Sequence, residues 1–534
     1  MGFEDALQRV GSDGLYQRAF TIFGAFACIV PLMQNLASIF TLKMYPMKCN
    51  YGNGTLVDDE NYCDNCPSFY ESVPEVEGSY TIRNHFNLFC EREYLGELGN
   101  TFFFIGLACA GAVGGVFADH YGRKPLGLFS TSLMTVCAIA APFMPNFWLY
   151  TVCRTGVGLG IPGLYNGLFT LLFETLDTEK RSSYYILIIQ GWSSGVLFTA
   201  LFGYLFPSFI YYEVAMGIGT IPVVLVTLIL PESPRWLWVM GKRKAAMRSL
   251  NKIAKWNRNE PIGMSELATL MGMEEDNRRS KRVKAEDAVS EAQRKPKESA
   301  GITELFKHKY ILMATVVTWF NWFSVTMCYY GWSLMVGDVG GSVYENLIYG
   351  GAMEIGGRFV VLFVADKVGR RPFAIFLTWT VTVCCGVAAA LVAMGKEGST
   401  ALMVVGMLGR SFISWSWDIL GLIMAEYPPT PVRVIISGTT STWSRIGGIV
   451  SAQFTTIGRW NTNAPHFLIM AITFVAGLSC FIYPETQGLT LSDSMLEADT
   501  YIRDNFGCCR GNQSEEKDAE VSMRQLEQRE NEDC

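Results

Sequence analysis

Five ionisable residues lie deep inside long apolar stretches in the second half of the chain. They are Glu354, Arg358, Arg410, Asp418 and Arg445. A charged side chain at mid-membrane depth is costly, so a protein keeps one there where it binds a substrate, an ion or another charge. Three arginines against two carboxylates leave one net positive charge. Because a guanidinium group binds carboxylates well, the pattern favours a site for a small organic anion or zwitterion.

A structural interpretation is also open for these charges. Glu354 and Arg358 are four residues apart, share one face of a helix and can neutralise each other. Arg410 and Asp418 are eight residues apart, so they project about 80° from each other and cannot pair directly. Arg445 has no partner within its own helix. Arg445 is therefore the strongest candidate for a substrate-binding cation, and the other four residues are candidates beside it.

Aromatic side chains occur at the same depth as these charges. Trp322, Tyr329 and Trp443 lie far enough from the ends of their apolar stretches to line a cavity. Most aromatic residues in such stretches pack against neighbours or anchor the helix at the membrane interface. Asn35, close to Pro31 in the first stretch, is a further polar candidate. Such walls suit aromatic or amphipathic organic ions better than sugars.

The stretches that carry these residues predict an all-α membrane protein. Half of the 534 residues are hydrophobic and only 17% are charged, against roughly a quarter in a typical soluble chain. A run of about 20 apolar residues can cross a bilayer as a helix. We predict twelve transmembrane helices, near residues 19–42, 97–118, 125–144, 146–173, 184–206, 212–230, 310–336, 345–365, 372–395, 399–425, 434–457 and 465–483.

Charged features recur in the two halves at a nearly constant offset. The pairs are Asp119 with Asp366, Glu174 with Glu426, Arg181 with Arg433, and Glu232 with Glu485, which are 247, 252, 252 and 253 residues apart. Such repeats indicate a transporter in which two parallel six-helix bundles rock around a site near the midplane. The expected gating residues are Asp119, Arg123, Glu174, Arg181 and Glu232 in the first half, and Asp366, Arg370, Arg371, Glu426 and Arg433 in the second.

The distribution of Lys and Arg predicts the orientation and the domains. These residues gather in connections that lie on one side if the helices alternate, so this side and both termini are expected in the cytoplasm. The expected parts are a cytoplasmic N-terminus (1–18), an N-terminal bundle (19–230), cytoplasmic linker helices (231–309), a C-terminal bundle (310–483) and a cytoplasmic tail (484–534).

The connection at residues 43–95 is acidic and is expected outside the cell. It contains Cys49, Cys63, Cys66 and Cys90, an even number that predicts two disulfide bonds of open pairing. The Cys63–Cys66 spacing also occurs in zinc sites, but nearby histidines are lacking apart from His85, so no metal site is expected. Asn53 begins an Asn-Gly-Thr sequence and is a predicted glycosylation site.

Several motifs resemble the organic ion transporter family of the major facilitator superfamily, whose members carry organic cations, anions and zwitterions. The likeness covers the chain to about residue 490, through the cysteine-bearing loop and residues 115–125, 231–237, 322–331, 425–433 and 443–448. Sugar porters share the 231–237 motif but not the long first loop or the aromatic residues near 322–331. The resemblance implies the major facilitator fold, with two pseudo-symmetric six-helix bundles, in the plasma membrane.

The resemblance also implies roles for single residues. Arg445 falls where anion and carnitine carriers have an arginine and cation carriers tend to have an aspartate. Arg358 falls where anion carriers have a basic residue, whereas Asp418 departs from their pattern, which is more often asparagine. Positions that line the cavity of the family correspond to Gln190, Tyr329 and Tyr330.

In the superfamily, the 115–125 motif is thought to latch the two bundles together on the cytoplasmic side. The resemblance implies that Asp119 faces the start of the eleventh span and that Arg123 lies near Glu174 or Glu232. Such contacts would hold the outward-open state and break in the inward-open state.

These features predict a transporter rather than an enzyme, because no nucleophile, metal-ligand set or phosphate loop is visible. The expected activity is alternating-access transport of small organic ions, favouring anions or zwitterions and driven by a gradient or an exchanged counter-ion. Two alternatives stay open: an organic cation or carnitine transporter that uses Glu354 and Asp418, and a non-transporting receptor or sensor on the same fold. We expect no cofactor and no nucleic-acid partner, and the sequence does not indicate an oligomeric state.

Overall fold

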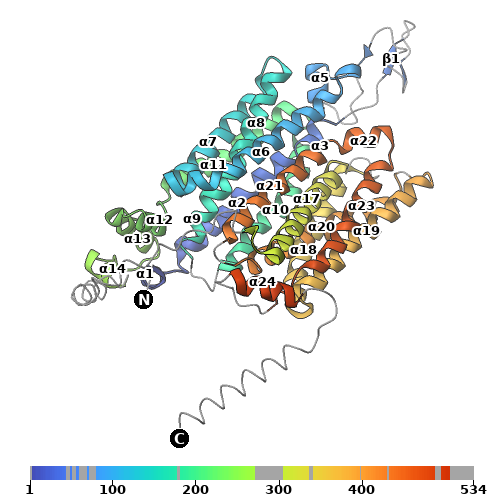
Figure 1. Ribbon diagram of the computed structural model, residues 1–534. Helices are drawn as coiled ribbons and strands as arrows, with labels where there is room; N and C mark the ends of the chain where they lie inside the picture. Colours follow the sequence, from blue (N-terminus) through green and yellow to red (C-terminus); the bar gives the residue numbers. More distant parts are fainter. Residues whose placement is uncertain are drawn as a thin grey trace.

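The computed structural model describes residues 3–43, 48–50, 56–58, 69–70, 80–176, 181–270, 305–335, 341–396, 398–429, 432–487 and 495–505. Long helices run side by side through most of this length (Figure 1). The first half contributes α2 (Leu15–Leu36) with α3 (Ser38–Thr41), α6 (Tyr94–Tyr121), α7 (Arg123–Ala140), α8 (Phe147–Leu164) with α9 (Thr170–Phe173), α10 (Arg181–Leu205) and α11 (Phe209–Ile229). The second half contributes α17 (Lys309–Leu334), α18 (Val343–Val368), α19 (Arg370–Ala393), α20 (Thr400–Glu426), α21 (Arg433–Ser451) with α22 (Phe454–Trp460), and α23 (Ala464–Ser479).

Each of the twelve predicted apolar stretches falls on one of these helices. Within the described residues, nine helices are long and apolar enough to cross a membrane. A tenth is present if the two parts of Cys90–Tyr121, which are bent by 43°, form one span. The other two, α20 and α21, are of similar length but more polar, because they contain Arg410, Asp418 and Arg445. The predicted helical membrane fold is confirmed.

One end of the bundle, which we call the loop end, carries the 43–95 connection (Figure 1). Three short antiparallel strands lie there in the order β2–β1–β3: β1 (Lys48–Asn50), β2 (Leu56–Asp58) and β3 (Phe69–Tyr70). The all-α expectation did not include them. The helix α5 (Ile82–Phe86) and the turn Cys90–Arg92 follow. Cys90 is disulfide-bonded, while Asn53, Cys63, Cys66 and the side chain of Cys49 lie outside the described residues.

The opposite end, which we call the basic end, carries short helices. They are α1 (Phe3–Val10), α12 (Pro234–Val239), α13 (Arg243–Trp256), α14 (Met264–Leu270) and α24 (Met495–Asp504) (Figure 1). Asn257, just after α13, holds the N-terminal segment because its side-chain amide donates to the carbonyl of Gly11 at 2.8 Å. Arg9 of α1 adds an ion pair of 2.9 Å to Glu266 of α14.

Close helix packing in the first half depends on glycines of α8. A Cβ atom at Gly160 would lie 2.6 Å from the carbonyl oxygen of Ser130 on α7. A Cβ atom at Gly158 would clash with the carbonyl oxygen of Phe103 on α6. Small residues let helix backbones approach closely where no hydrophobic force drives association. The glycines therefore let α8 pack against both neighbours at once.

In each half, a residue from the segment that follows the six long helices caps the N-terminus of the first of these helices. In the first half, Asn257 accepts a hydrogen bond from the backbone N–H of Tyr16 in α2 at 2.8 Å. In the second half, Asp499 of α24 accepts hydrogen bonds from the N–H groups of Tyr310 and Ile311 in α17, at 2.9 and 3.1 Å. The first N–H groups of a helix lack partners within the helix, and a carboxylate also interacts favourably with the helix dipole.

Replacing Asp499 by alanine should destabilise the second half. The change leaves two helix N–H groups without an acceptor, which costs about 1 kcal/mol. We expect the apparent melting temperature of the purified protein in detergent to fall by roughly 1–2 °C. Asp504→Ala is the matched control on the same helix, because Asp504 pairs only with its neighbour Arg503 within the described residues. Equal melting temperatures of the two variants would contradict the capping role.

Candidate functional site

The four charges on α18 and α20 form two ion pairs between these helices. Nη2 of Arg410 lies 3.1 Å from Oε1 of Glu354. Nε of Arg358 lies 3.2 Å from Oδ2 of Asp418. Glu354 and Arg358 therefore each pair with the neighbouring helix, and the pairing within one helix that the sequence left open is not formed. Each pair neutralises itself, which offsets the cost of burying its charges.

Arg410 is fixed on several sides. Its Nε donates to the hydroxyl of Ser333 at 3.0 Å and its Nη2 donates to the hydroxyl of Tyr329 at 3.3 Å. Its guanidinium carbon lies 5.2 Å from the centre of the Tyr329 ring. The side chains of Arg410 and Glu354 are 4% and 0% exposed. This pair therefore serves as a fixed contact between α17, α18 and α20.

Arg358 lies at the boundary between the two halves. Its Nη1 donates to the carbonyl oxygen of Ile189 on α10 at 2.5 Å, so it joins the second half to the first. The next residue, Gln190, has a buried side-chain amide whose oxygen and nitrogen both lack a hydrogen-bond partner among the described residues. The structure thus places Arg358 against the backbone of the residue next to Gln190.

Arg445 differs from the other arginines of the cluster. Its Nε is buried without a hydrogen-bond acceptor, and no carboxylate lies within ion-pair distance in the part of the chain that the structure describes. A Cβ atom at Gly448, three residues after Arg445, would lie 2.7 Å from the ring of Phe104 on α6, and this ring also contacts Tyr330 of α17 at 5.0 Å. Tyr330 and Tyr165, the latter just after α8, belong to different halves. Both hydroxyls are buried and lack described partners. A positive charge and two unsatisfied hydroxyls therefore lie where the two halves meet.

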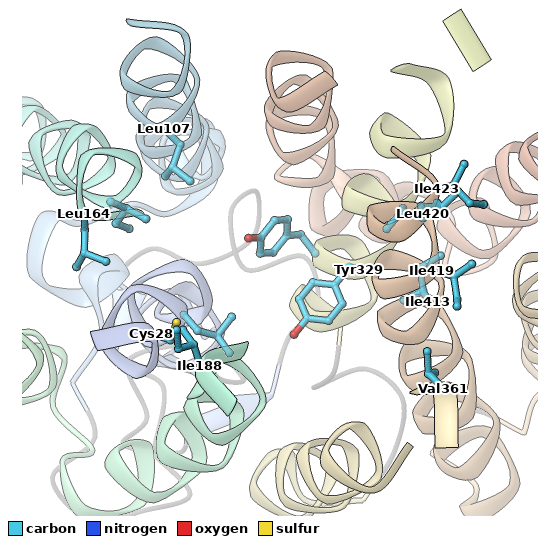
Figure 2. Packing of buried hydrophobic residues seen from close by; sticks show 14 of the residues in the cluster. Cys28, Leu107, Leu164, Ile188, Tyr329, Val361, Ile413, Ile419, Leu420 and Ile423 are labelled. Carbon is cyan, nitrogen blue, oxygen red and sulfur yellow. The ribbon is translucent and has the colours of Figure 1, made fainter. Parts of the chain in front are cut away.

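Aromatic rings from both halves surround this region. The ring of Tyr330 lies 5.0 Å from Phe104 of α6 and 5.5 Å from Tyr329. Trp417 of α20 lies 5.6 Å from Trp322 and 6.0 Å from Tyr329. Figure 2 shows Tyr329 extending from its helix toward the side of the bundle that carries Cys28 and Ile188. Trp417 was not among the predicted site residues, although its depth in α20 matches theirs.

Two predicted candidates do not join the charge cluster. Trp443 is exposed, stacks on Trp319 at 6.2 Å and, two residues from Arg445, points to the opposite side of α21. Asn35 donates to the carbonyl of Pro31 in its own helix at 2.7 Å. Its amide nitrogen therefore bonds within α2, while its side-chain oxygen is buried without a described partner.

Arg154 and Glu213 form a buried charge pair between helices of the first half, and neither was among the predicted site residues. Arg154 donates to the side-chain oxygen of Gln34 at 2.5 Å and lies 3.9 Å from Glu213 on α11. Glu213 is fully buried and accepts a hydrogen bond of 2.6 Å from Tyr150. The predicted helix began at residue 212, so Glu213 resembled an end position. The apolar residues that precede it were the signal that the helix starts earlier.

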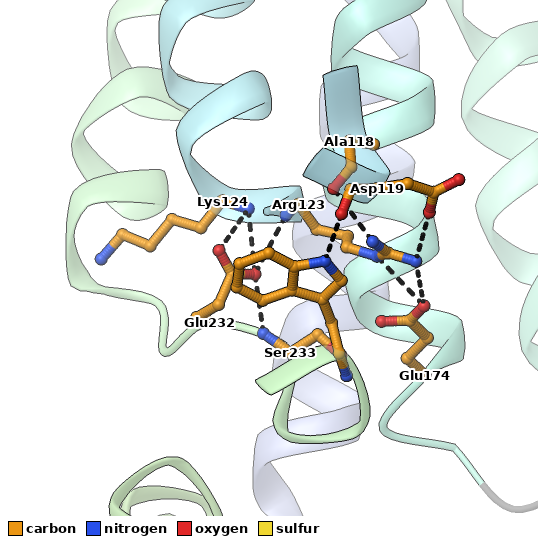
Figure 3. A network of polar contacts seen from close by, with 8 residues as sticks. Ala118, Asp119, Arg123, Lys124, Glu174, Glu232 and Ser233 are labelled. Carbon is orange, nitrogen blue, oxygen red and sulfur yellow. Dashed lines mark hydrogen bonds and ion pairs between the residues drawn. The ribbon is translucent and has the colours of Figure 1, made fainter. Parts of the chain in front are cut away.

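At the basic end, Arg123 joins three segments of the first half (Figure 3). Its guanidinium group lies 3.0 Å from both Asp119 and Glu174 and donates to the carbonyl of Ala118 at 2.9 Å. The structure therefore contains the predicted contact between Arg123 and Glu174. This contact ties the end of α6 and the start of α7 to the end of α9.

Glu232 caps the start of α7 (Figure 3). Its carboxylate accepts hydrogen bonds from the backbone N–H groups of Arg123, Lys124 and Ser233, at 3.1, 3.1 and 2.8 Å. Gly122 has a φ of 109°, and a Cβ atom there would clash with the Glu232 carboxylate. Burial raises the pKa of Glu232 above its ordinary value, while these N–H groups and the charge of Arg123 act in the opposite direction.

The second half repeats this arrangement. Glu485 accepts from the N–H groups of Arg370 and Arg371, at 2.9 and 3.2 Å. Arg370 lies 3.4 Å from Glu426. Gly369 has a φ of 97°, and a Cβ atom there would lie 2.7 Å from Glu485. Glu485 was noted in the repeat but omitted from the predicted gating residues.

The predicted latch between the halves is not formed among the described residues. Asp119 is 76% exposed and pairs with Arg123 of its own half, four residues away. Arg433, at the start of α21, donates to the carbonyl of Pro428 in its own half. The side chains of Arg181 and Asp366 lie outside the described residues. The described charge networks at the basic end therefore each stay within one half.

The two halves instead meet toward the loop end. Gln453, between α21 and α22, donates to the hydroxyl of Thr101 on α6 at 2.9 Å. The ring of Phe40 on α3 stacks on Tyr344 of α18 at 5.3 Å. Contacts at the loop end combined with separate networks at the basic end are what an alternating-access transporter requires when it is open toward the basic end.

Comparison with known proteins identifies the family. A family model described as "Sugar (and other) transporter" matches residues 81–495. The chain is 24% identical over 539 residues to an organic cation transporter-like protein of Drosophila melanogaster, covering 94% of this chain and 93% of the relative. It is 23% identical over 535 residues to organic anion transporter 3 of Sus scrofa, covering 94% of each.

The fold is also that of a solved transporter. The xylose transporter XylE from E. coli, in an inward-open conformation, aligns with a TM-score of 0.61 at 14% identity, covering 91% of this chain and 99% of that one. These matches confirm the predicted resemblance to organic ion transporters of the major facilitator superfamily. The chain belongs to the sugar (and other) transporter family and is a membrane transporter rather than an enzyme.

Proposed function

We propose that this protein transports small organic anions or zwitterions by alternating access, with Arg445 binding the carboxylate of the substrate. One observation carries the proposal. The two other arginines of the cluster, Arg358 and Arg410, each have a carboxylate partner at 3.2 and 3.1 Å. Arg445 has none among the described residues, and its Nε is buried without an acceptor. An anionic substrate would supply the missing partner.

The surroundings of Arg445 support an organic substrate. Tyr330 and Tyr165 offer hydroxyls that lack partners in the described part of the chain, and they come from different halves. Tyr329, Trp322 and other rings provide amphipathic surface beside them. A substrate with a carboxylate and an apolar or aromatic body would match this environment. Because the hydroxyls belong to both halves, such a substrate would contact both halves at once.

Transport of organic cations or carnitine is the second candidate. The name of the Drosophila melanogaster relative, an organic cation transporter-like protein, favours it, whereas the Sus scrofa relative is named for organic anions. A cation carrier needs a carboxylate that is free to bind its substrate. Glu354 and Asp418 are both within ion-pair distance of an arginine. This pairing supports the anion over the cation.

The proposed setting is the plasma membrane, with both termini and the basic end in the cytoplasm. Lys and Arg residues of the connections gather at this end, as expected for cytoplasmic segments. Energy would come from a gradient or an exchanged counter-ion. The repeated networks of Arg123 and Arg370 keep each half rigid at this end, which suits rigid-body rocking.

Replacing Arg445 by aspartate should abolish anion uptake. The change removes the unpaired cation and adds a repulsive charge, so uptake of a labelled p-aminohippurate-like anion into proteoliposomes should fall about 100-fold or more. Tetraalkylammonium and carnitine uptake, measured side by side, tests the cation alternative. Arg503→Gln, which changes an exposed arginine of α24, is the control and should transport normally. Normal anion uptake by the Arg445→Asp variant would refute the proposal.

Replacing Asp119 by alanine should slow transport without changing substrate preference. In the present state Asp119 is largely exposed and pairs only with Arg123 among the described residues, so its loss should change stability by less than about 0.5 kcal/mol. In the opposite state its carboxylate is available to the second half. We expect initial uptake rates to fall roughly threefold to tenfold while the ratio of anion to cation uptake stays constant. A changed ratio would show that Asp119 acts on the substrate instead.

A further inference from the structure

We infer that Asp418 limits this transporter to substrates that carry a single negative charge, because it neutralises Arg358. The inference rests on the proposed function, in which Arg445 binds one carboxylate. It adds a limit on the charge that the rest of the substrate can carry. A second carboxylate would need a second available cation, and the ion pair between Arg358 and Asp418 withholds the arginine that lies at the boundary of the halves.

The charges near the boundary of the halves support this rule. Arg410 is held by Glu354, Ser333 and Tyr329, and is 4% exposed. Arg154 of the first half is held by Gln34 and lies near Glu213. Neither arginine is available to a substrate without breaking several contacts. Arg358, in contrast, is held by the carboxylate of Asp418 and the backbone carbonyl of Ile189, so removing the charge of Asp418 leaves it with one neutral contact among the described residues.

Arg358 and Asp418 also have the right position to control specificity. Arg358 reaches the carbonyl of Ile189 in the other half, beside the unpartnered amide of Gln190. Asp418 is 21% exposed, whereas Glu354, the partner of Arg410, is 0% exposed. Asp418 is thus the more accessible of the two carboxylates. Its pair with Arg358 lies at the boundary between the halves, because Arg358 also contacts Ile189 of α10.

The physical cost of a dianion follows from this arrangement. Moving a carboxylate from water into a poorly hydrated site is expensive unless a cation and hydrogen bonds compensate it. The second carboxylate of a dianion would meet an arginine that is already neutralised, and it would be repelled by Asp418. A monoanion avoids both penalties. Specificity would then come partly from a repulsive element, as in many selective sites.

The test compares two substrates of the same shape and different charge. The probes are labelled p-toluate, a monoanion, and terephthalate, in which a second carboxylate replaces the methyl group. Wild-type protein in proteoliposomes should take up p-toluate and largely exclude terephthalate. Asp418→Asn removes the charge at nearly constant volume and frees Arg358. We expect the uptake ratio of terephthalate to p-toluate to rise about tenfold.

Three further variants make the result specific. Asp418→Glu retains the carboxylate and should keep the wild-type ratio. The double variant Asp418→Asn/Arg358→Gln removes the freed cation and should return the ratio to the wild-type level. Arg358→Gln alone leaves Asp418 uncompensated, so uptake of p-toluate should fall while terephthalate stays excluded. This last variant also tests the rule if the Asp418→Asn protein fails to fold.

The outcomes separate the inference from the proposed function. An unchanged ratio in the folded Asp418→Asn protein would overturn the single-charge rule while leaving anion transport at Arg445 intact. A rise in the ratio that persists in the double variant would also overturn it, because Arg358 would then not be the cation involved. Loss of p-toluate uptake in Arg445→Asp, with the rule upheld in Asp418→Asn, would support both. Wild-type exclusion of both probes together with robust cation uptake would refute the proposed function itself.

Discussion

The structure depends on one constraint, which is that a charge buried in a poorly hydrated interior needs a partner. The cost of an unpaired buried charge exceeds most other single terms in a folded protein. In this chain the constraint decides which helices carry matching residues: α18 pairs with α20 twice, and Arg154 of α8 faces Glu213 of α11. The exception is Arg445, which lacks a described partner. An exception to a costly rule is where function is most reasonably sought.

The same constraint explains the repeated network at the basic end. Helices α7 and α19 each begin after a sharp glycine turn, at Gly122 and Gly369, and each exposes backbone N–H groups at its start. Glu232 and Glu485 accept hydrogen bonds from these groups. Each carboxylate therefore joins two segments of its own half and also satisfies the N-terminus of a helix. These bonds join elements within a half and not across halves. They rigidify the bodies that must move without fixing their relative position.

The sequence predicts the helices well because the length of an apolar stretch is a local property. All twelve predicted stretches fall on helices, and the repeat of charged motifs in the sequence indicates two related halves. Partner choice is not local. Glu354 and Arg358 share a helix face, yet each pairs with α20, because helix packing decides which side chains meet. Trp443 is a predicted cavity residue at the depth of Arg445, but it lies on the opposite side of α21, as its two-residue spacing on a helix requires.

The predicted latch contact of Asp119 belongs to a different conformation from the one described here. The resemblance placed it across from the second half, whereas here it is exposed beside Arg123. A latch that holds one state must be open in the other, so its residues are solvated and weakly paired in the state that lacks it. In contrast, Glu174 and Glu232 stay bound within their half. Asp119 is exposed and can therefore change its partner between states. Glu174 and Glu232 are bound within their half and keep it rigid.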